Sequence, residues 1–308
     1  MSLQLVGHVD LPPNIGEGGF DHSDVHSASD RLYVAHTSNN AVDVIDCARN
    51  RYVESLSGLT AVAGALVSMA RRLVFTSNRG ENTVSMFTPG AERDAVKITV
   101  GIKPNGLAFD PGRGALLAAN VGDPSIAGSS TVSVVDIERK AVVAEITMPG
   151  RTRWAVYDPV RDVFYVNVAD PAQIVTIDAR NPSKIDSAIV VSAAGPHGLD
   201  IDSQAGRLYC ACDAGVLFAI DAVTGQAVGE VALTGPPDVI FLQRETGRLY
   251  VAIGNPGVID VIDARQMRRV QTIETEAGAH TLALDRKRGS VYSFLPQTHQ
   301  AAIYLDKA

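Results

Sequence analysis

Residues 101–150 read GIKPNGLAFDPGRGALLAANVGDPSIAGSSTVSVVDIERKAVVAEITMPG, and they contain one complete copy of a pattern that recurs along the chain. The stretch holds four short runs rich in apolar residues, GLAFD, ALLAAN, TVSVVD and AVVAEITM, with turn-forming residues between them. Short apolar runs bounded by glycine, proline and aspartate are typical of β-strands. The pattern therefore predicts a unit of four antiparallel strands.

The second run of this unit recurs along the whole chain, as RLYVAH, RLVFTSN, ALLAAN, VFYVNV, RLYCAC, RLYVAIGN and SVYSFL. Successive copies lie 41 to 48 residues apart, measured between Leu32, Leu73, Leu116, Phe164, Leu208, Leu249 and Val291. A period of roughly 40 to 50 residues is typical of four-stranded propeller blades. No segment shows a helical apolar period over three turns, which disfavours a parallel α/β fold. The sequence predicts an all-β, seven-bladed β-propeller with four-stranded antiparallel blades.

The seventh copy lacks a fourth strand, because only Lys307 and Ala308 follow Asp306. A run with the same alternation, LQLVGHVDLPP, lies near the N-terminus at residues 3–13. Pairing this run into the last blade closes the ring and leaves no open seam. We therefore expect residues 1–308 to form a single β-propeller domain in which residues 1–12 supply the outer strand of the closing blade.

The third strand of every copy except the second ends in an aspartate. An aspartate at the end of an alternating strand can accept hydrogen bonds from backbone amides two residues on. We predict a turn-forming role for Asp46, Asp136, Asp178, Asp221, Asp263 and Asp306.

Charge and composition exclude several classes of function. The net charge is −7 and the basic residues are scattered, so a nucleic-acid partner is not expected. No run approaches the roughly 18 apolar residues of a transmembrane helix, and no signal peptide is recognisable. We expect a cytoplasmic protein, or a periplasmic one if a leader preceded this chain. Cys47, Cys210 and Cys212 are interpreted as small buried residues.

The repeats resemble the YVTN-type repeat of the YncE-like β-propeller proteins. The resemblance is carried by second-strand segments such as YV (33–34), VFTSN (74–78), LAAN (117–120) and YVN (165–167), and by GIKPNGLAFDPGRG and TVSVVDIE. It spans all seven blades, but the matching motifs are those that form the strands and turns. The resemblance therefore supports the architecture and not a particular chemistry. It implies a binding or surface protein, often exported, without an assigned reaction. Bacterial lactonases and streptogramin lyases form similar rings, and the catalytic patterns of those enzymes are not matched here.

One position of the repeat is expected to face the mouth of the central channel, where propellers usually bind their ligands. It lies five residues before the aspartate, or its substitute, that ends the inner strand. The position is occupied by Asp21, Val62, Asn105, Arg153, His197, Asp238 and His280, with His22 and His26 near the first of them. Because six of the seven are polar, we expect a hydrated mouth. The predicted ligand-binding residues are Asp21, His22, Asn105, Arg153, His197, Asp238 and His280.

Three interpretations of this mouth remain open. The polar rim could be merely solvated, it could bind a small ligand without a metal, or His197, Asp238, His280 and Asp21 could hold a divalent metal ion. The first functional hypothesis is a binding propeller that takes a small ligand, ion or peptide at the mouth. The alternative is a metal-dependent hydrolase or lyase, lactonase-like, with a His/Asp site there. Catalytic residues stay unassigned because no nucleophile motif is present.

Two further features bear on the mouth. The insertion Val121–Ser130 makes the longest loop expected on this face, long enough to lean over the channel. Trp154, the only tryptophan, directly follows Arg153. Alternation along a strand places neighbours on opposite faces, so we expect Trp154 between blades and Arg153 toward the channel.

Overall fold

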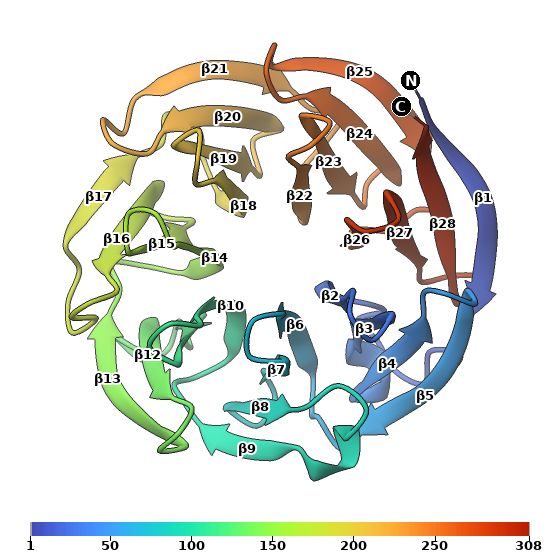
Figure 1. Cartoon of the computed structure of the whole chain (residues 1–308). Helices are drawn as coiled ribbons and strands as arrows, with labels where there is room; N and C mark the ends of the chain where they lie inside the picture. Colours follow the sequence, from blue (N-terminus) through green and yellow to red (C-terminus); the bar gives the residue numbers. More distant parts are fainter. Residues whose placement is uncertain (1, 308) are drawn as a thin grey trace.

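The computed structural model describes residues 2–307, which form 28 strands and two short 3-10 helices. The strands make seven four-stranded antiparallel sheets arranged as blades around a central axis (Figure 1). This confirms the seven-bladed β-propeller predicted from the repeats. Both helices, η1 (Thr37–Asn39) and η2 (Glu92–Asp94), are single turns, and within residues 2–307 no helix is long and apolar enough to cross a membrane.

Each blade runs from an inner strand at the axis to an outer strand at the rim. The inner strands are β2 (Ser23–His26), β6 (Val62–Ser68), β10 (Pro104–Asp110), β14 (Thr152–Asp158), β18 (Pro196–Asp202), β22 (Ile240–Gln243) and β26 (Leu282–Asp285). The second strands are β3 (Arg31–His36), β7 (Leu73–Asn78), β11 (Ala115–Asn120), β15 (Val163–Val168), β19 (Arg207–Cys212), β23 (Arg248–Ile253) and β27 (Ser290–Leu295). The third strands are β4 (Ala41–Asp46), β8 (Thr83–Phe87), β12 (Thr131–Asp136), β16 (Gln173–Asp178), β20 (Val216–Asp221), β24 (Val258–Asp263) and β28 (Gln300–Lys307). The outer strands are β5 (Arg51–Ser57), β9 (Val96–Thr99), β13 (Ala141–Thr147), β17 (Ser187–Val190), β21 (Ala227–Ala232), β25 (Arg268–Glu274) and β1 (Ser2–Asp10).

The N-terminal strand closes the ring, as predicted. β1 pairs antiparallel with β28 and is the outer strand of the last blade (Figure 1). Leu3 and Val9 point into the apolar layers on the two sides of this blade, while Val6 lies at a bulge and is 53% exposed. Gln271 of β25 bonds both backbone groups of Leu3, at 2.9 and 3.1 Å. The closing strand is therefore tied to the preceding blade as well as to its own.

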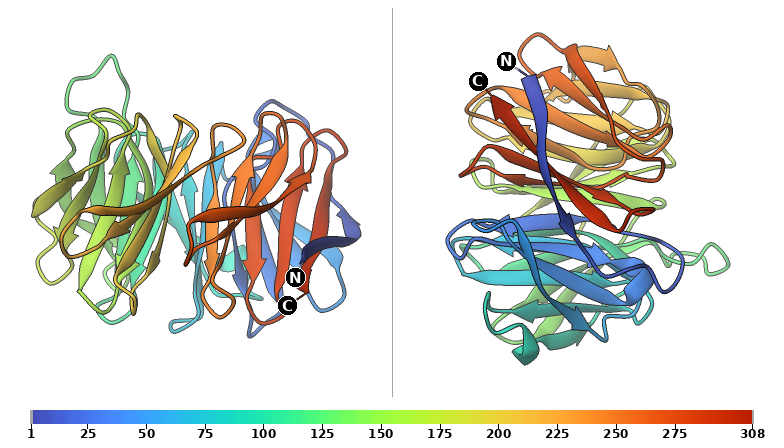
Figure 2. Two further views of the ribbon diagram at one scale, coloured as in Figure 1. Left: turned by 90° about the horizontal axis from the view of Figure 1, so that it is seen from above. Right: turned by 90° about the vertical axis from the view of Figure 1, so that its right-hand side faces the viewer.

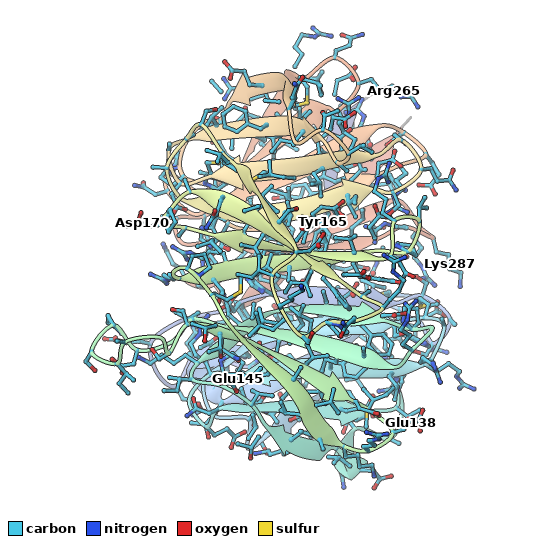
Figure 3. The ribbon with its side chains drawn as sticks, turned by 90° about the vertical axis from the view of Figure 1, so that its left-hand side faces the viewer. Glu138, Glu145, Tyr165, Asp170, Arg265 and Lys287 are labelled. Atoms are coloured by element: carbon cyan, nitrogen blue, oxygen red, sulfur yellow. The ribbon has the colours of Figure 1, made fainter. Side chains whose placement is uncertain are left out.

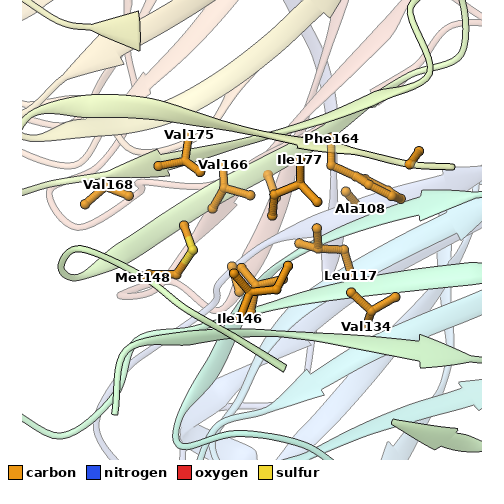
Figure 4. Packing of buried hydrophobic residues seen from close by; sticks show 14 residues of the cluster. Ala108, Leu117, Val134, Ile146, Met148, Phe164, Val166, Val168, Val175 and Ile177 are labelled. Atoms are coloured by element: carbon orange, nitrogen blue, oxygen red, sulfur yellow. The ribbon is translucent and has the colours of Figure 1, made fainter. Parts of the chain in front are cut away.

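The apolar core is divided into seven layers, one between each pair of neighbouring blades. Figure 4 shows the layer in which Leu117 and Ile146 of the third blade face Phe164 and Val175 of the fourth. Because a blade is covered on both faces, its second and third strands need apolar side chains on both sides. This explains why runs such as ALLAAN are almost continuously apolar, whereas the outer strands alternate between partly buried and exposed residues.

Five of the predicted turn aspartates behave as expected. Asp46 Oδ1, for example, accepts the amides of Ala48 and Arg49, both at 3.0 Å. Asp136, Asp178, Asp221 and Asp263 make equivalent bonds. For Asp306 the amide two residues on belongs to Ala308, which lies outside the described residues, and Asp306 Oδ2 accepts the hydroxyl of Tyr250 at 2.7 Å. The predicted small buried cysteines are confirmed: Cys47, Cys210 and Cys212 are buried free thiols.

The two ends of the ring carry different loops. Figure 3 shows Asp170, between β15 and β16, at one end, and Glu138 and Lys287, in the turns after β12 and β26, at the other. We call the first end the mouth face and the second the base face. The loop at residues 121–130 projects beyond its neighbours on the mouth face (Figure 2). Connections between second and third strands therefore gather where the site residues are expected.

Candidate functional site

The predicted site residues lie together on the mouth face, where each blade's inner strand begins. Asn105, Arg153 and His197 are the second residues of β10, β14 and β18, and the other four lie one or two residues before β2, β22 or β26. In the second blade the predicted position was displaced by one residue. Val62 pairs with Asn78 as Pro104 pairs with Asn120, so Ala63 is the equivalent of Asn105.

Glycines in the inner strands set the spacing between consecutive site residues. A Cβ on Gly106 would collide with the backbone carbonyl of Arg153, and one on Gly198 would collide with that of Asp238. Each glycine lies one residue after a site residue and lets the next blade's backbone come within contact distance. The motif GL in these strands thus brings His197 and Asp238 within reach of each other.

His197 is the centre of the ion-pair network at the mouth. Its Nδ1 lies 2.7 Å from Asp213 Oδ1, and its Nε2 lies 3.2 Å from Asp238 Oδ1. A guanidinium nitrogen of Arg153 is also 3.2 Å from Nε2. Burial lowers the pKa of His197, but the two carboxylates outweigh that effect and raise the pKa to about 9. At neutral pH the site therefore holds an imidazolium between two carboxylates.

Asp238 connects His197 to two other histidines. His22 Nε2 and His280 Nε2 lie 3.8 and 3.9 Å from its two carboxylate oxygens. Burial raises the pKa of Asp238, but the neighbouring His197 charge and the imidazole of His22 outweigh it and hold the pKa well below its usual range. His280 Nδ1 donates to the Gly278 carbonyl at 2.8 Å, which turns Nε2 toward Asp238.

The network continues to the first three blades through Arg79. Its guanidinium lies 2.6 Å from Asn105 Oδ1 and 3.4 Å from Asp21 Oδ2. Asp21 in turn contacts His22 Nε2 at 3.2 Å. All seven predicted ligand-binding residues thus lie in one contiguous set of contacts across the mouth. His26, by contrast, lies at the other end of β2, where its Nδ1 contacts Ser29 Oγ at 2.6 Å.

The predicted metal ligands are engaged with one another and with arginine. Both ring nitrogens of His197 face carboxylates, and the Arg153 guanidinium approaches the nitrogen that a metal would use. Across residues 2–307, no group of three or more His, Cys, Asp or Glu side chains is arranged to hold a metal ion. The metal set His197, Asp238, His280 and Asp21 stays a prediction, and the geometry described here is that of an ion-pair network.

A basic cavity of about 490 Å³ adjoins this network on the mouth face. Its charged walls are Arg79, Lys103 and Arg151, and the ends of the loop Val121–Ser130 form the opposite wall. Lys103 Nζ lies 3.4 Å from Asp123 of the loop. The side chain of Arg151 makes no hydrogen bond or ion pair with the residues described. Burial, and then repulsion from Arg151, lower the pKa of Arg153, so the cavity and the network are electrostatically connected.

Sequence reasoning missed the residues that come from loops. Asp213 follows β19, Arg79 follows β7, and Lys103 and Arg151 precede β10 and β14. All lie outside the inner-strand position that was used to choose site residues. Arg79 and Asp213 lie in loops that join second and third strands, and Lys103 and Arg151 lie in segments that cross from an outer strand to the next inner strand, so the available signal was a charged residue in such a segment.

Trp154 contributes both to a layer between blades and to the channel. Its indole lines the channel and packs against His22, with ring centroids 4.1 Å apart, and it meets the edge of Phe241 at 6.3 Å. The ring packs against the apolar layer between the fourth and fifth blades, as expected, but it also reaches across the axis. The channel between the inner strands is narrow enough for one large aromatic side chain to reach a residue on the other side.

Comparison with known proteins identifies the fold alone. No family model matches the chain, and no curated protein matches its sequence. The WD40 β-propeller domain of Doa1 has a similar structure, with a TM-score of 0.80, 12% sequence identity, and coverage of 99% of this chain and 97% of that one. Because 1808 chains of solved structures match, the likeness is too widely shared to indicate a ligand. The chain is a seven-bladed β-propeller related in structure to WD40 propellers.

Proposed function

We propose that this protein is a binding propeller whose mouth face takes a small anionic ligand. The observation that carries the proposal is the basic cavity, in which Arg79, Lys103 and Arg151 share one concave surface and Arg151 has no described partner. The chain has a net charge of −7, so a cavity surrounded by three cations differs in sign from the protein as a whole. Guanidinium groups are well suited to carboxylate and phosphate, because they donate two parallel hydrogen bonds.

The neighbouring network supports a binding role. Asp213 and Asp238 hold the side chains of Arg153 and His197 in place. Because these side chains are already ordered, they lose little conformational entropy when a ligand binds. The cavity volume of about 490 Å³ falls within the roughly 300 to 1,000 Å³ of small-molecule sites. The resemblance to YVTN-type propellers, which implies a binding protein, agrees with this function.

The proposal is tested by isothermal titration at low ionic strength with citrate and with pyrophosphate, using glycerol as a neutral probe. We expect at least one anion to bind, and its affinity to fall about tenfold or more in Arg151→Gln. Arg265→Gln is the matched control, because Arg265 is an exposed arginine far from the mouth (Figure 3). Absence of binding by both anions, or equal loss in the two variants, would contradict the proposal.

A further inference from the structure

The central channel is a second cavity, separate from the basic one. It has a volume of about 440 Å³ and is lined by side chains from the inner strands. At the mouth end it is crossed by the rings of Trp154 and His22, which contact each other. At the base end its lining includes Met69 and Pro159, which lie in the turns after β6 and β14. The channel is therefore a deep pocket that opens on the base face.

The walls of this pocket are apolar for most of its depth. Leu66, Phe109, Val156, Tyr157 and Phe241 all line it. A channel that held only water would be expected to show polar side chains on its inner strands. Apolar and aromatic walls with a volume in the range of small-molecule sites are typical of a pocket that takes an apolar ligand body.

Two carboxylates in the pocket accept hydrogen bonds from backbone amides. Asp24 accepts the amide of Val67 in the next blade at 2.7 Å, and Asp200 accepts the amide of Leu242 in the next blade at 2.7 Å. Each also accepts the amide of the following residue in its own strand. These aspartates hold neighbouring inner strands together, which leaves the recognition of a ligand's charge to other residues.

The rim on the base face has an uneven distribution of charge. The residue directly after the inner strand is Met69, Pro111 or Pro159 in the second, third and fourth blades, and Arg244 or Arg286 in the sixth and seventh. One Nη of each arginine donates to a backbone carbonyl, at 2.8 and 3.4 Å. Neither forms an ion pair with a carboxylate of residues 2–307. One side of the opening is thus apolar, and the other side carries two arginines that each donate one of these hydrogen bonds. Burial raises the pKa of Asp200 in this pocket, and the nearby charges of Arg286 and Arg244 lower it, so the two arginines also interact electrostatically with this carboxylate.

We propose that this channel is a second binding site, for a small amphipathic anion whose apolar body enters from the base face and whose single carboxylate or sulfonate meets Arg244 and Arg286. The apolar walls and rim accept the body, and the guanidinium groups of these two rim arginines accept the head. The site shares no rim residue with the basic cavity at the mouth and is independent of the function proposed there.

The position of Trp154 provides a direct test, because the only tryptophan of the chain lines this pocket. Titration with 1-anilinonaphthalene-8-sulfonate should quench Trp154 by energy transfer, with one site per chain. Decanoate should displace the dye, and decanol, which lacks the charge, should do so about tenfold less well. Val156→Phe, which fills the channel, should abolish transfer while its circular dichroism stays that of the wild type.

The arginine variant decides whether the rim recognises the charge. In Arg244→Gln/Arg286→Gln, whose changes are on exposed residues, decanoate should lose about tenfold in affinity and decanol should be unchanged. Arg151→Gln at the mouth should leave both affinities unchanged, so failure of one site is separable from failure of the other. The proposal is overturned if the dye shows no saturable transfer, if decanol and decanoate compete equally in wild type and double variant, or if Arg151→Gln alone removes binding.

Discussion

The indole of Trp154 packs against the imidazole of His22, with ring centroids 4.1 Å apart and planes tilted by 50°. The two residues belong to the fourth and first blades, on opposite sides of the ring (Figure 1). A contact between distant blades passes across the channel instead of along the ring. It separates the ion-pair network at the mouth from the apolar pocket below.

Removing this contact should destabilise the ring. We expect Trp154→Ala to lower the free energy of unfolding by about 2 to 4 kcal/mol, because a large aromatic contact is lost and a void remains. Trp154→Phe should cost less than half of that. Urea unfolding followed by circular dichroism measures both, and equal stability of Trp154→Ala and wild type would show that the indole makes no stabilising contact.

Stability should depend on pH through His197. Its pKa in the folded protein, about 9, is above the unfolded value of 6.5, so the folded state binds the proton more tightly. The stabilisation is complete below pH 6.5 and is lost as the pH rises toward 9, on the order of 2 kcal/mol in total. His197→Asn should reduce the change in unfolding free energy between pH 6.5 and pH 9, whereas His8→Asn, at an exposed position, should leave that change as it is in the wild type. Thermal unfolding measured across this range tests the prediction.

The close approach at Gly198 should tolerate no side chain. Gly198→Ala would push a Cβ into the carbonyl of Asp238, so we expect a loss of about 1 to 3 kcal/mol in stability. The pH dependence assigned to His197 should weaken in the same variant, because Asp238 is displaced. Gly7→Ala is the matched control, since a Cβ there meets nothing within 4 Å. Similar stability of the two variants would argue against a spacing role.

Ring closure should depend on the inward face of β1. Leu3 is 2% exposed and Val6 is 53% exposed, although both lie in the same strand. We expect Leu3→Asp to lose about 2 to 4 kcal/mol, because it buries a carboxylate without a partner. Val6→Asp should change stability by less than about 0.5 kcal/mol. Chemical unfolding and size-exclusion chromatography compare the pair, and equal effects would mean that β1 does not contribute to the core.

Elemental analysis distinguishes the metal hypothesis from the ion-pair network. Because Arg153 approaches His197 Nε2 at 3.2 Å, we expect no stoichiometric metal in protein purified without chelators. A near-stoichiometric divalent metal that disappears in His197→Ala/His280→Ala would require Arg153 to move away, and it would favour the metal-dependent alternative.

The mouth could be located from the repeat, but only in part. One register position identified residues from six blades that lie together in the structure, because blades repeat their backbone geometry. The same register failed at Val62, where an inner strand without a terminal aspartate left the alignment uncertain by one residue. It also could not find Asp213, Arg79 or Arg151, because loops do not follow the repeat.

The sequence by itself determined the number of blades, the order of their strands and the closure by the N-terminus. Those features follow from a pattern that each repeat carries locally, namely alternating apolar runs and turn residues. The closure follows because the last repeat lacks a fourth strand and an extra strand lies near the N-terminus. Only the tertiary structure decided which side chains meet across the axis, such as Trp154 with His22 and His197 with Asp238. These partners come from different blades, and their contacts depend on side-chain rotamers and on the channel's width, which no local pattern specifies.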